Sequence, residues 1–232
     1  MQAEVNTKGL ISILMKAYGP QVRPPSSDPF HLILWEQIGY LIDDDRRLKA
    51  FNNLAEATGL LPDRIASATE ETLLGIARSG GAIGYKQRAS RLKQTAQIVL
   101  EKYDGNLKAA LSSNVRVARR VLKSFPMIGE PGADKILLLS GIAPTFSLES
   151  NGLRVLLRVG VGKEDTSYTK SYTSVMKELE DHLPVDQIWL SEAHLVLRYL
   201  GQNVCRRSNP SCTVCPISNK CSYFHEQAMS IS

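Results

Sequence analysis

Four cysteines near the C-terminal end of the chain are spaced closely enough to bind a metal ion or a metal cluster together. They follow the pattern Cys205-x6-Cys212-x2-Cys215-x5-Cys221, and the sequence holds no others. Thiolates on such short loops can surround one tetrahedral metal ion or one cubane iron–sulfur cluster. A secreted disulfide protein would spread its cysteines to close long loops. The grouping therefore predicts a metal or cluster site in a reducing compartment, and the spacing leaves zinc and iron–sulfur both open.

A second pattern that suits binding is a helical hairpin in the middle of the chain. Helical periodicity over 115–124 is followed by the turn Pro126-Met-Ile-Gly129 and by a further helical stretch to about residue 141. Glycine permits a sharp bend that points bare N–H groups outward, and the next helix N-terminus adds positive partial charge. Such a turn can bind a phosphate without any lysine, although an ordinary αα-hairpin fits the same pattern.

The cysteine segment resembles a known signature. Its spacing, and Pro210 and Pro216 between the cysteines, are similar to the iron–sulfur motif of endonuclease III and MutY-like DNA glycosylases. The resemblance implies a [4Fe–4S] cluster on the four cysteines that is mainly structural. It also implies that Arg206 and Arg207 face DNA phosphates; a solvated basic loop is the alternative.

The hairpin turn resembles that of the same family, which usually reads Leu-Pro-Gly-Val/Ile-Gly. Pro126 and Gly129 match this pattern, whereas Met127 stands at the first glycine. The resemblance implies that Met127 and Gly129 contact the DNA backbone. We expect the turn to be less tight than the family's, because glycine bends there most freely.

The resemblance also places a catalytic carboxylate after the hairpin. Enzymes that excise a base evert the nucleotide and stabilise an oxocarbenium-like sugar while the bond breaks. In the stretch 147–155, Glu149 occupies the family's aspartate position and Asn151 matches the asparagine of MutY-like members. Glu149 is thereby implied as the catalytic carboxylate, one methylene longer than aspartate, and Asn151 as a DNA-binding residue. The alternative for Glu149 is a carboxylate that stabilises a helix N-terminus.

Bifunctional members of the family carry a lysine two residues after the last glycine of the hairpin, where it forms an imine with the sugar. Pro131 occupies that position here, and Lys135 lies one turn further along the helix. We therefore expect a monofunctional enzyme without efficient β-lyase chemistry.

A third match lies in the helix that begins after Asp28. The segment from Trp35 to Ile42 is similar to the MutY-like Ser-Glu-x-x-Leu-Gln-Gln-Thr, whose glutamate protonates adenine. Glu36 takes that position in an otherwise apolar turn, which favours a protonated carboxyl that assists the leaving base. Tyr40 replaces a glutamine that probes the gap left by the flipped base, and we expect it to wedge into the base stack. A surface glutamate and a core tyrosine are the alternatives.

The composition agrees with a globular nucleic-acid-binding protein. The chain has 232 residues, of which 43% are apolar and 22% charged, and a formal net charge of +5. These values exclude wholesale disorder, and no apolar stretch is long enough to cross a bilayer. We expect a cytoplasmic, nucleoid-associated monomer of bacterial or archaeal type whose partner is double-stranded DNA with a lesion or mismatch.

The elements that position these residues are helices, because apolar residues recur at helical rather than strand spacing. We expect an all-α protein of about ten helices, among them one over 85–103 and one opened by a capping box at Ser67-Ala-Thr-Glu70. The resemblance implies two lobes with DNA across the cleft between them. One is a six-helix barrel with the hairpin over 29–142, and the other is the cluster-containing lobe of 1–28 and 143–232.

The function implied is a monofunctional DNA N-glycosylase of base excision repair. Two other classes stay open from the sequence. The substitutions at Pro131, Glu149 and Tyr40 also suit a catalytically degenerate protein that binds lesions or unusual DNA structures. A zinc protein whose four cysteines hold a helical scaffold is the remoter alternative.

Overall fold

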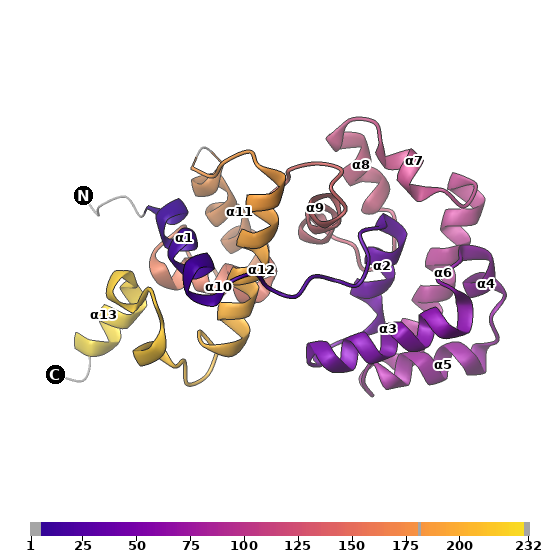
Figure 1. Ribbon diagram of the computed structural model, residues 1–232, viewed down its shortest axis with the longest axis horizontal. Helices are drawn as coiled ribbons and strands as arrows, with labels where there is room; N and C mark the ends of the chain where they lie inside the picture. The colour runs from indigo at the N-terminus through magenta and orange to yellow at the C-terminus, as the bar shows by residue number, and fades with distance from the viewer. Residues whose placement is uncertain (1–5, 181, 230–232) are drawn as a thin grey trace. The chain divides into compact units, whose positions relative to one another are not determined.

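The computed structural model describes residues 6–180 and 182–229, and every regular element in these ranges is helical. Figure 1 shows the course of the chain. The elements are α1 (Thr7–Tyr18), α2 (Pro29–Ile38), α3 (Asp44–Thr58), α4 (Pro62–Ser67), α5 (Glu70–Ser79), α6 (Tyr85–Tyr103), α7 (Leu107–Leu111), α8 (Val115–Leu122), α9 (Glu130–Leu139), α10 (Ser150–Val159), α11 (Tyr168–Leu179), α12 (Gln187–Asn203), the 3₁₀ helices η1 (Cys212–Val214) and η2 (Ser218–Lys220), and α13 (Ser222–Met229).

The chain folds into two compact units, each with its own apolar core. The unit of residues 24–143 contains α2 to α9. The other combines the chain up to Arg23 with the chain from Pro144 onward, so that α1 packs against the distant α12. Within the described residues, no helix is both long and apolar enough to cross a membrane.

Helix α6 is the centre of the 24–143 unit and packs against α2, α4, α5 and α7. Its apolar face is buried completely at Leu92, Ala96 and Val99. Helix α2 begins where the sequence predicts, because the Asp28 carboxylate accepts hydrogen bonds from the backbone N–H groups of Phe30 (2.9 Å) and His31 (3.2 Å). Because α2 packs against α6, the side chains in the C-terminal turn of α2 are held in a fixed position.

Two loops of this unit touch because a glycine allows it. A Cβ added to Gly80, just after α5, would lie 2.1 Å from the carbonyl oxygen of Ile38 at the end of α2. The loop after α5 is also held by the buried guanidinium of Arg88, which donates to the carbonyl oxygens of Ala77 (2.6 Å), Gly81 and Ile83. Burial lowers the pKa of Arg88 from its usual value, and the three carbonyl partners offset the cost of burying its charge.

The core of the other unit depends on the close packing of α10 against α12, with α1 on α12. Gly152 on α10 and Gly201 on α12 are the small residues at this contact. A Cβ added to Gly201 would lie 2.5 Å from the carbonyl oxygen of Asn151, so the two backbones touch there. The approach brings the N-terminus of α10 next to the end of α12, which leads into the cysteine segment.

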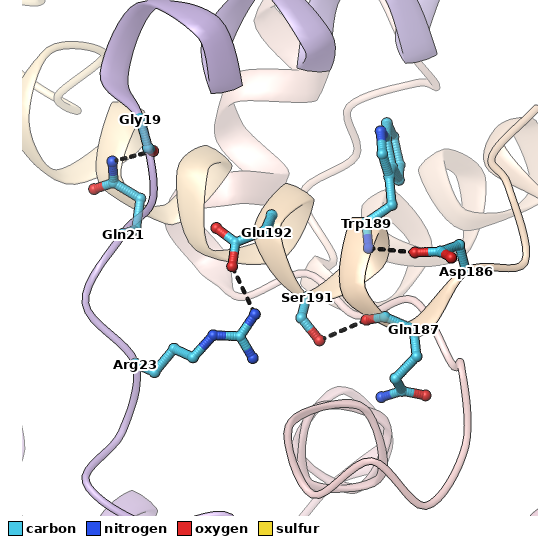
Figure 2. Close-up of polar contacts among 8 residues, drawn as sticks. All are labelled: Gly19, Gln21, Arg23, Asp186, Gln187, Trp189, Ser191 and Glu192. Atoms are coloured by element: carbon cyan, nitrogen blue, oxygen red, sulfur yellow. Dashed lines mark hydrogen bonds and ion pairs between the residues drawn. The ribbon is translucent and has the colours of Figure 1, made fainter.

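Short polar contacts fix the chain around the start of α12, as Figure 2 shows. The Asp186 carboxylate caps the helix by accepting from the N–H of Trp189 (2.6 Å), and the Arg23 guanidinium pairs with Glu192 (2.6 Å). Gln21 folds back to donate to the carbonyl oxygen of Gly19 (3.0 Å). The segment after α1 is therefore tied to α12 by the pair of Arg23 with Glu192.

Two sequence expectations differ from the structure. The described residues form thirteen α-helices rather than about ten, and the short α7 and α13 were not predicted. The capping box at 67–70 is wrong: Ser67 ends α4, and it is Thr69 whose hydroxyl accepts from the N–H of Thr72 (3.2 Å) at the start of α5. The helix that the box was expected to open does form, and its cap lies two residues later than predicted, because Thr69 as well as Ser67 can cap a helix.

Gly201→Ala should destabilise the protein by about 1–3 kcal/mol, because the new methyl group must push α10 and α12 apart. Urea unfolding followed by circular dichroism measures the loss. Gly75→Ala is the matched control, since a Cβ there meets nothing within 4 Å and lies inside a helix where alanine is favoured. Equal stability of Gly201→Ala and wild type would contradict the close packing of these helices.

Candidate active site and metal centre

The hairpin between α8 and α9 contains a tight turn with a methionine at its left-handed position. Met127 has a positive φ of 65°, the left-handed conformation that glycine adopts most easily. The N–H of Ile128 donates to the carbonyl oxygen of Phe125 (3.2 Å), which closes the turn. Met127 therefore accepts backbone strain in this turn, and its side chain is 70% exposed.

A buried glutamine ties the turn to the rest of its unit. The Gln37 amide donates to the carbonyl oxygen of Pro126 (2.9 Å) and exchanges hydrogen bonds with the hydroxyl of Thr95 on α6 (2.9 and 3.0 Å). Gln37 is only 4% exposed, so these bonds are shielded from water. Sequence analysis assigned Gln37 no role, and its signal is a polar residue on the apolar face of α2.

The two helices of the hairpin are also joined by an ion pair. The Arg119 guanidinium on α8 lies 2.5 Å from the Asp134 carboxylate on α9. Burial raises the pKa of Asp134, and the bond from Arg119 opposes that rise. The pair fixes the angle at which α9 presents its N-terminus, where Gly129 is the N-cap.

Glu36 on α2 is paired with Lys135 on α9 at 2.5 Å. Their side chains are 22% and 16% exposed, so Glu36 is not the freely solvated surface glutamate that the sequence also allowed. The pair places one acidic and one basic group together on the 24–143 unit, one helical turn beyond Pro131.

Glu149 closes the N-terminus of α10. Its Oε1 accepts from the backbone N–H groups of Asn151 (2.9 Å) and Gly152 (3.0 Å), and its Oε2 accepts from the side-chain amide of Asn151 (2.9 Å). Three donors thus fix a carboxylate whose longer side chain folds back onto its own helix. Both readings of Glu149 share this geometry, since a capping carboxylate and a fixed catalytic anion are held in the same way.

A chain of hydrogen bonds leads from this carboxylate to the first cysteine. The Arg154 guanidinium donates to Oδ1 of Asn151 (2.9 Å), to the carbonyl oxygen of Gly201 (2.6 Å) and to that of Cys205 (2.9 Å). Burial lowers the pKa of Arg154, while the nearby Cys205 raises it. Asn151, predicted as a DNA-binding residue, is here the link between Glu149 and Arg154.

Arg158, one turn along α10, holds the next part of the cysteine segment. It donates to the carbonyl oxygens of Arg206 (2.8 Å) and Arg207 (3.1 Å), lies 3.3 Å from the sulfur of Cys205, and stacks 4.5 Å above the ring of Tyr223. The backbones of both predicted DNA-binding arginines are therefore anchored, and their side chains are exposed. Sequence analysis missed Arg154 and Arg158, although four-residue spacing on one helix face was a usable signal.

The four cysteines line one partly open cavity of ≈ 20 Å³. None forms a disulfide. The rest of the lining is mostly apolar and comprises Val204, Ser218, Tyr223 and Phe224. Burial and the neighbouring thiols raise the pKa of the Cys212, Cys215 and Cys221 thiols, so the set needs nearby positive charge to hold all its sulfurs as thiolates. Such a donor set suits a cationic metal centre.

Tyr40 is not a core residue. It is 54% exposed in the loop after α2, beside Leu41, which is 77% exposed and has a positive φ of 51°. Ile83, which is 59% exposed, belongs to the loop that Arg88 anchors, and the two loops meet at Gly80. Three apolar side chains are thus presented to solvent on adjoining loops, and the sequence analysis had identified only the first.

The strain at Met127 predicts an order of stabilities. The free energy of unfolding of Met127→Gly should equal that of wild type or exceed it by up to about 1 kcal/mol. Glycine removes the strain of the left-handed conformation, but it also raises the entropy of the unfolded chain. Met127→Ile should lose about 1–2 kcal/mol, since a β-branched residue fits this conformation worst. Thermal unfolding of the three proteins measures the order, and an isoleucine variant as stable as the glycine variant would contradict the turn geometry.

Comparison with known proteins places this architecture. Over 201 residues the chain is 24% identical to endonuclease III of Thermotoga maritima, covering 87% of this chain and 86% of the relative. It is 25% identical over 164 residues to the thymine-DNA glycosylase of Aeropyrum pernix, covering 71% and 69%. A solved structure of a trapped endonuclease III–DNA covalent intermediate superposes with a TM-score of 0.80 at 20% identity, covering 98% of this chain and all of that one.

The likeness to solved structures shows that the fold is the all-helical fold of endonuclease III. A family model described as HhH-GPD superfamily base excision DNA repair protein matches residues 42–184, which is more than half of the chain. The match spans the hairpin, Glu149 and the helix that carries Arg154 and Arg158. The chain therefore belongs to the HhH-GPD superfamily of base excision DNA repair proteins.

Proposed function

We propose that this protein is a monofunctional DNA N-glycosylase that everts a damaged or mismatched base from duplex DNA and hydrolyses its N-glycosidic bond. The observation that carries the proposal is the Glu149 carboxylate, fixed by three N–H donors at the N-terminus of α10. Glu149 stands at the position where the family has its catalytic aspartate. A preorganised anion stabilises positive charge without having to reorient during the reaction.

The chemistry follows from that anion. As the bond between C1′ and the base nitrogen breaks, its electron pair leaves with the base and the sugar becomes cationic. Glu149 stabilises this cation, and water adds at C1′ and loses a proton, which leaves an abasic sugar and the free base. The departing base needs a proton or a hydrogen bond, and we assign this assistance to Glu36 together with the Lys135 ammonium that contacts it.

Two features support hydrolysis without strand cleavage. Pro131 stands where bifunctional relatives have their lysine, and its ring nitrogen is tied in a peptide bond. Lys135, the nearest alternative amine on α9, is paired with Glu36. A protonated, ion-paired ammonium is a poor nucleophile. Trapping with borohydride should accordingly leave no covalent complex with DNA.

We propose duplex DNA as the partner, because each unit exposes groups that can bind it. The hairpin turn at Met127 and Gly129 precedes a helix N-terminus that favours phosphate. Exposed Arg206 and Arg207 supply positive charge, and Tyr40 on its loop is proposed to fill the gap in the base stack. A DNA-bound endonuclease III and a thymine-DNA glycosylase are among the proteins with this fold.

We propose that the four cysteines hold a [4Fe–4S] cluster whose role is structural. The four sulfurs line one common cavity, which suits a cubane. Zinc requires all four sulfurs about 2.3 Å from one point, and among the described residues no three cysteine, histidine or acidic side chains are placed to hold a single metal ion. The cluster, when bound, supplies positive charge and a rigid centre for the loop. Arg158 beside Cys205 and the apolar lining then keep the segment in place.

The catalytic proposal predicts that the protein produces abasic sites from at least one duplex in a defined panel. The panel contains uracil, thymine opposite guanine, adenine opposite 8-oxoguanine, oxidised pyrimidines and alkylated purines, and alkali reveals the abasic sites. Glu149→Gln should lower the single-turnover rate at least a hundredfold, because the amide preserves the shape and loses the charge.

Asp186→Asn is the matched control, since it neutralises another helix-capping carboxylate of the same unit (Figure 2) and should leave the rate unchanged. Full activity of Glu149→Gln would exclude Glu149 as the catalytic group. The second candidate is a catalytically degenerate DNA-binding protein in which Glu149 serves only as the cap of α10. Lesion binding without any abasic product would favour this candidate.

The cluster proposal predicts about four iron and four sulfide per chain, a brown protein, and loss of all four irons on acid treatment. Cys212→Ser should lower the iron content and the melting temperature together, because the segment loses its centre. The exposed Ser208→Ala change in the same loop is the control and should alter neither. One zinc per chain with no sulfide would contradict the proposal.

A further inference from the structure

Two tyrosines at the start of α11 stack on each other, and the outer ring of the pair is partly exposed to solvent. The rings of Tyr168 and Tyr172 lie 6.2 Å apart between centroids and 22° from parallel. Tyr172 is only 8% exposed and belongs to the core, whereas Tyr168 is 47% exposed. The inner ring therefore supports an outer ring that is accessible to a ligand.

The loop before α11 holds the outer ring in place. Side chains of α11 bind its backbone: Glu178 accepts from the N–H of Gly162 (2.7 Å), Ser174 from that of Lys163 (2.7 Å), and Ser171 from that of Asp165 (2.8 Å). Three side chains of one helix thus hold three backbone N–H groups of the connection. Because its backbone groups are held by these hydrogen bonds, the loop fixes the position of Tyr168, the first residue of α11.

Glu149 and Tyr168 stand at the N-terminal ends of two helices that pack against each other, α10 and α11. The connection after α10 meets α11 first at Glu178 and then at Ser174 and Ser171, so the two helices run in the same direction and their N-terminal ends lie at the same end of the pair. Burial raises the pKa of the Tyr168 phenol, and the charge of the Glu149 carboxylate raises it further. The two groups interact electrostatically within one unit, across the packing of α10 against α11. A half-exposed aromatic ring therefore lies at the same end of this helix pair as Glu149, the carboxylate that we propose faces the sugar.

We propose that Tyr168 is the platform on which the everted nucleobase stacks while Glu149 faces its sugar. The inference rests on the proposed glycosylase function and adds a residue that contacts the substrate. The base is bonded directly to C1′, so a ring beside the carboxylate is within reach of the base that leaves. Stacking uses the π-face that every base has, which suits an enzyme whose contacts with the base edge come from other residues.

The test separates stacking from folding and from catalysis. Two duplexes serve as probes: one carries a tetrahydrofuran abasic analogue, and the other carries the best panel base on a 2′-fluoro sugar, which resists cleavage. Tyr168→Ala should weaken binding of the base-containing duplex about tenfold and leave tetrahydrofuran binding unchanged. Tyr168→Phe keeps the ring and should bind both as wild type does.

Thr169→Ala, an exposed neighbour in the same helical turn, is the control for local structure and should change neither affinity. Equal weakening of both duplexes by Tyr168→Ala would overturn the proposal, because a missing platform affects only a duplex that has a base. A tenfold loss in Tyr168→Phe would overturn it as well, since the hydroxyl would then be the contact. Failure of wild-type protein to bind any panel duplex better than undamaged DNA would refute the glycosylase function itself, and with it the platform.

Discussion

The structure of the candidate site depends on helix α10 and the hydrogen bonds at its two ends. Glu149 closes the N-terminus of the helix, and Arg154 carries the connection through Asn151 to the carbonyl oxygen of Cys205. Every member of this chain is partly buried and each donor has an acceptor, so the network is shielded and satisfied. The position of a single carboxylate is therefore linked to the folding of the cysteine segment. The close approach of Gly201 to α10 makes the same connection through backbone packing.

The other unit solves a comparable problem with a neutral network. Gln37 and Thr95 hold the carbonyl oxygen of Pro126, and the turn then keeps Met127 in a conformation that costs energy for any residue but glycine. Strain persists where surrounding structure determines it, and such positions concentrate at functional sites. The hairpin thus forms a tight turn with methionine at a position that glycine adopts more easily.

Sequence reasoning predicted the features that local rules govern. The all-helical class, the start of α2 at Asp28 and the grouping of the cysteines follow from periodicity, capping and spacing, and the fold and superfamily are confirmed by comparison. The thirteen-helix count and the cap at Thr69 were missed, because short helices carry little periodicity and adjacent cap residues compete.

The side-chain partners could not be predicted, because they join residues far apart in the sequence. Lys135 is adjacent to Glu36, and Gln37 to Pro126, only after α2 and α9 have packed. The same holds for Tyr168, which sequence patterns present as an ordinary helix residue. The roles of Glu149, Glu36 and Tyr40 in catalysis and DNA binding stay predictions that rest on the resemblance and on the geometry around each.

Amide hydrogen exchange tests the central claim, that the cysteine segment and the carboxylate share one support, most directly. The N–H groups of Asn151 and Gly152 both donate to Glu149, and the N–H of Trp189 donates to the separate cap at Asp186 in the same unit. We expect exchange at Asn151 and Gly152 to accelerate at least tenfold when the proposed cluster is removed, while exchange at Trp189 changes little. Unchanged protection of Asn151 and Gly152, or equal acceleration at Trp189, would show that the carboxylate is held independently of the cysteines.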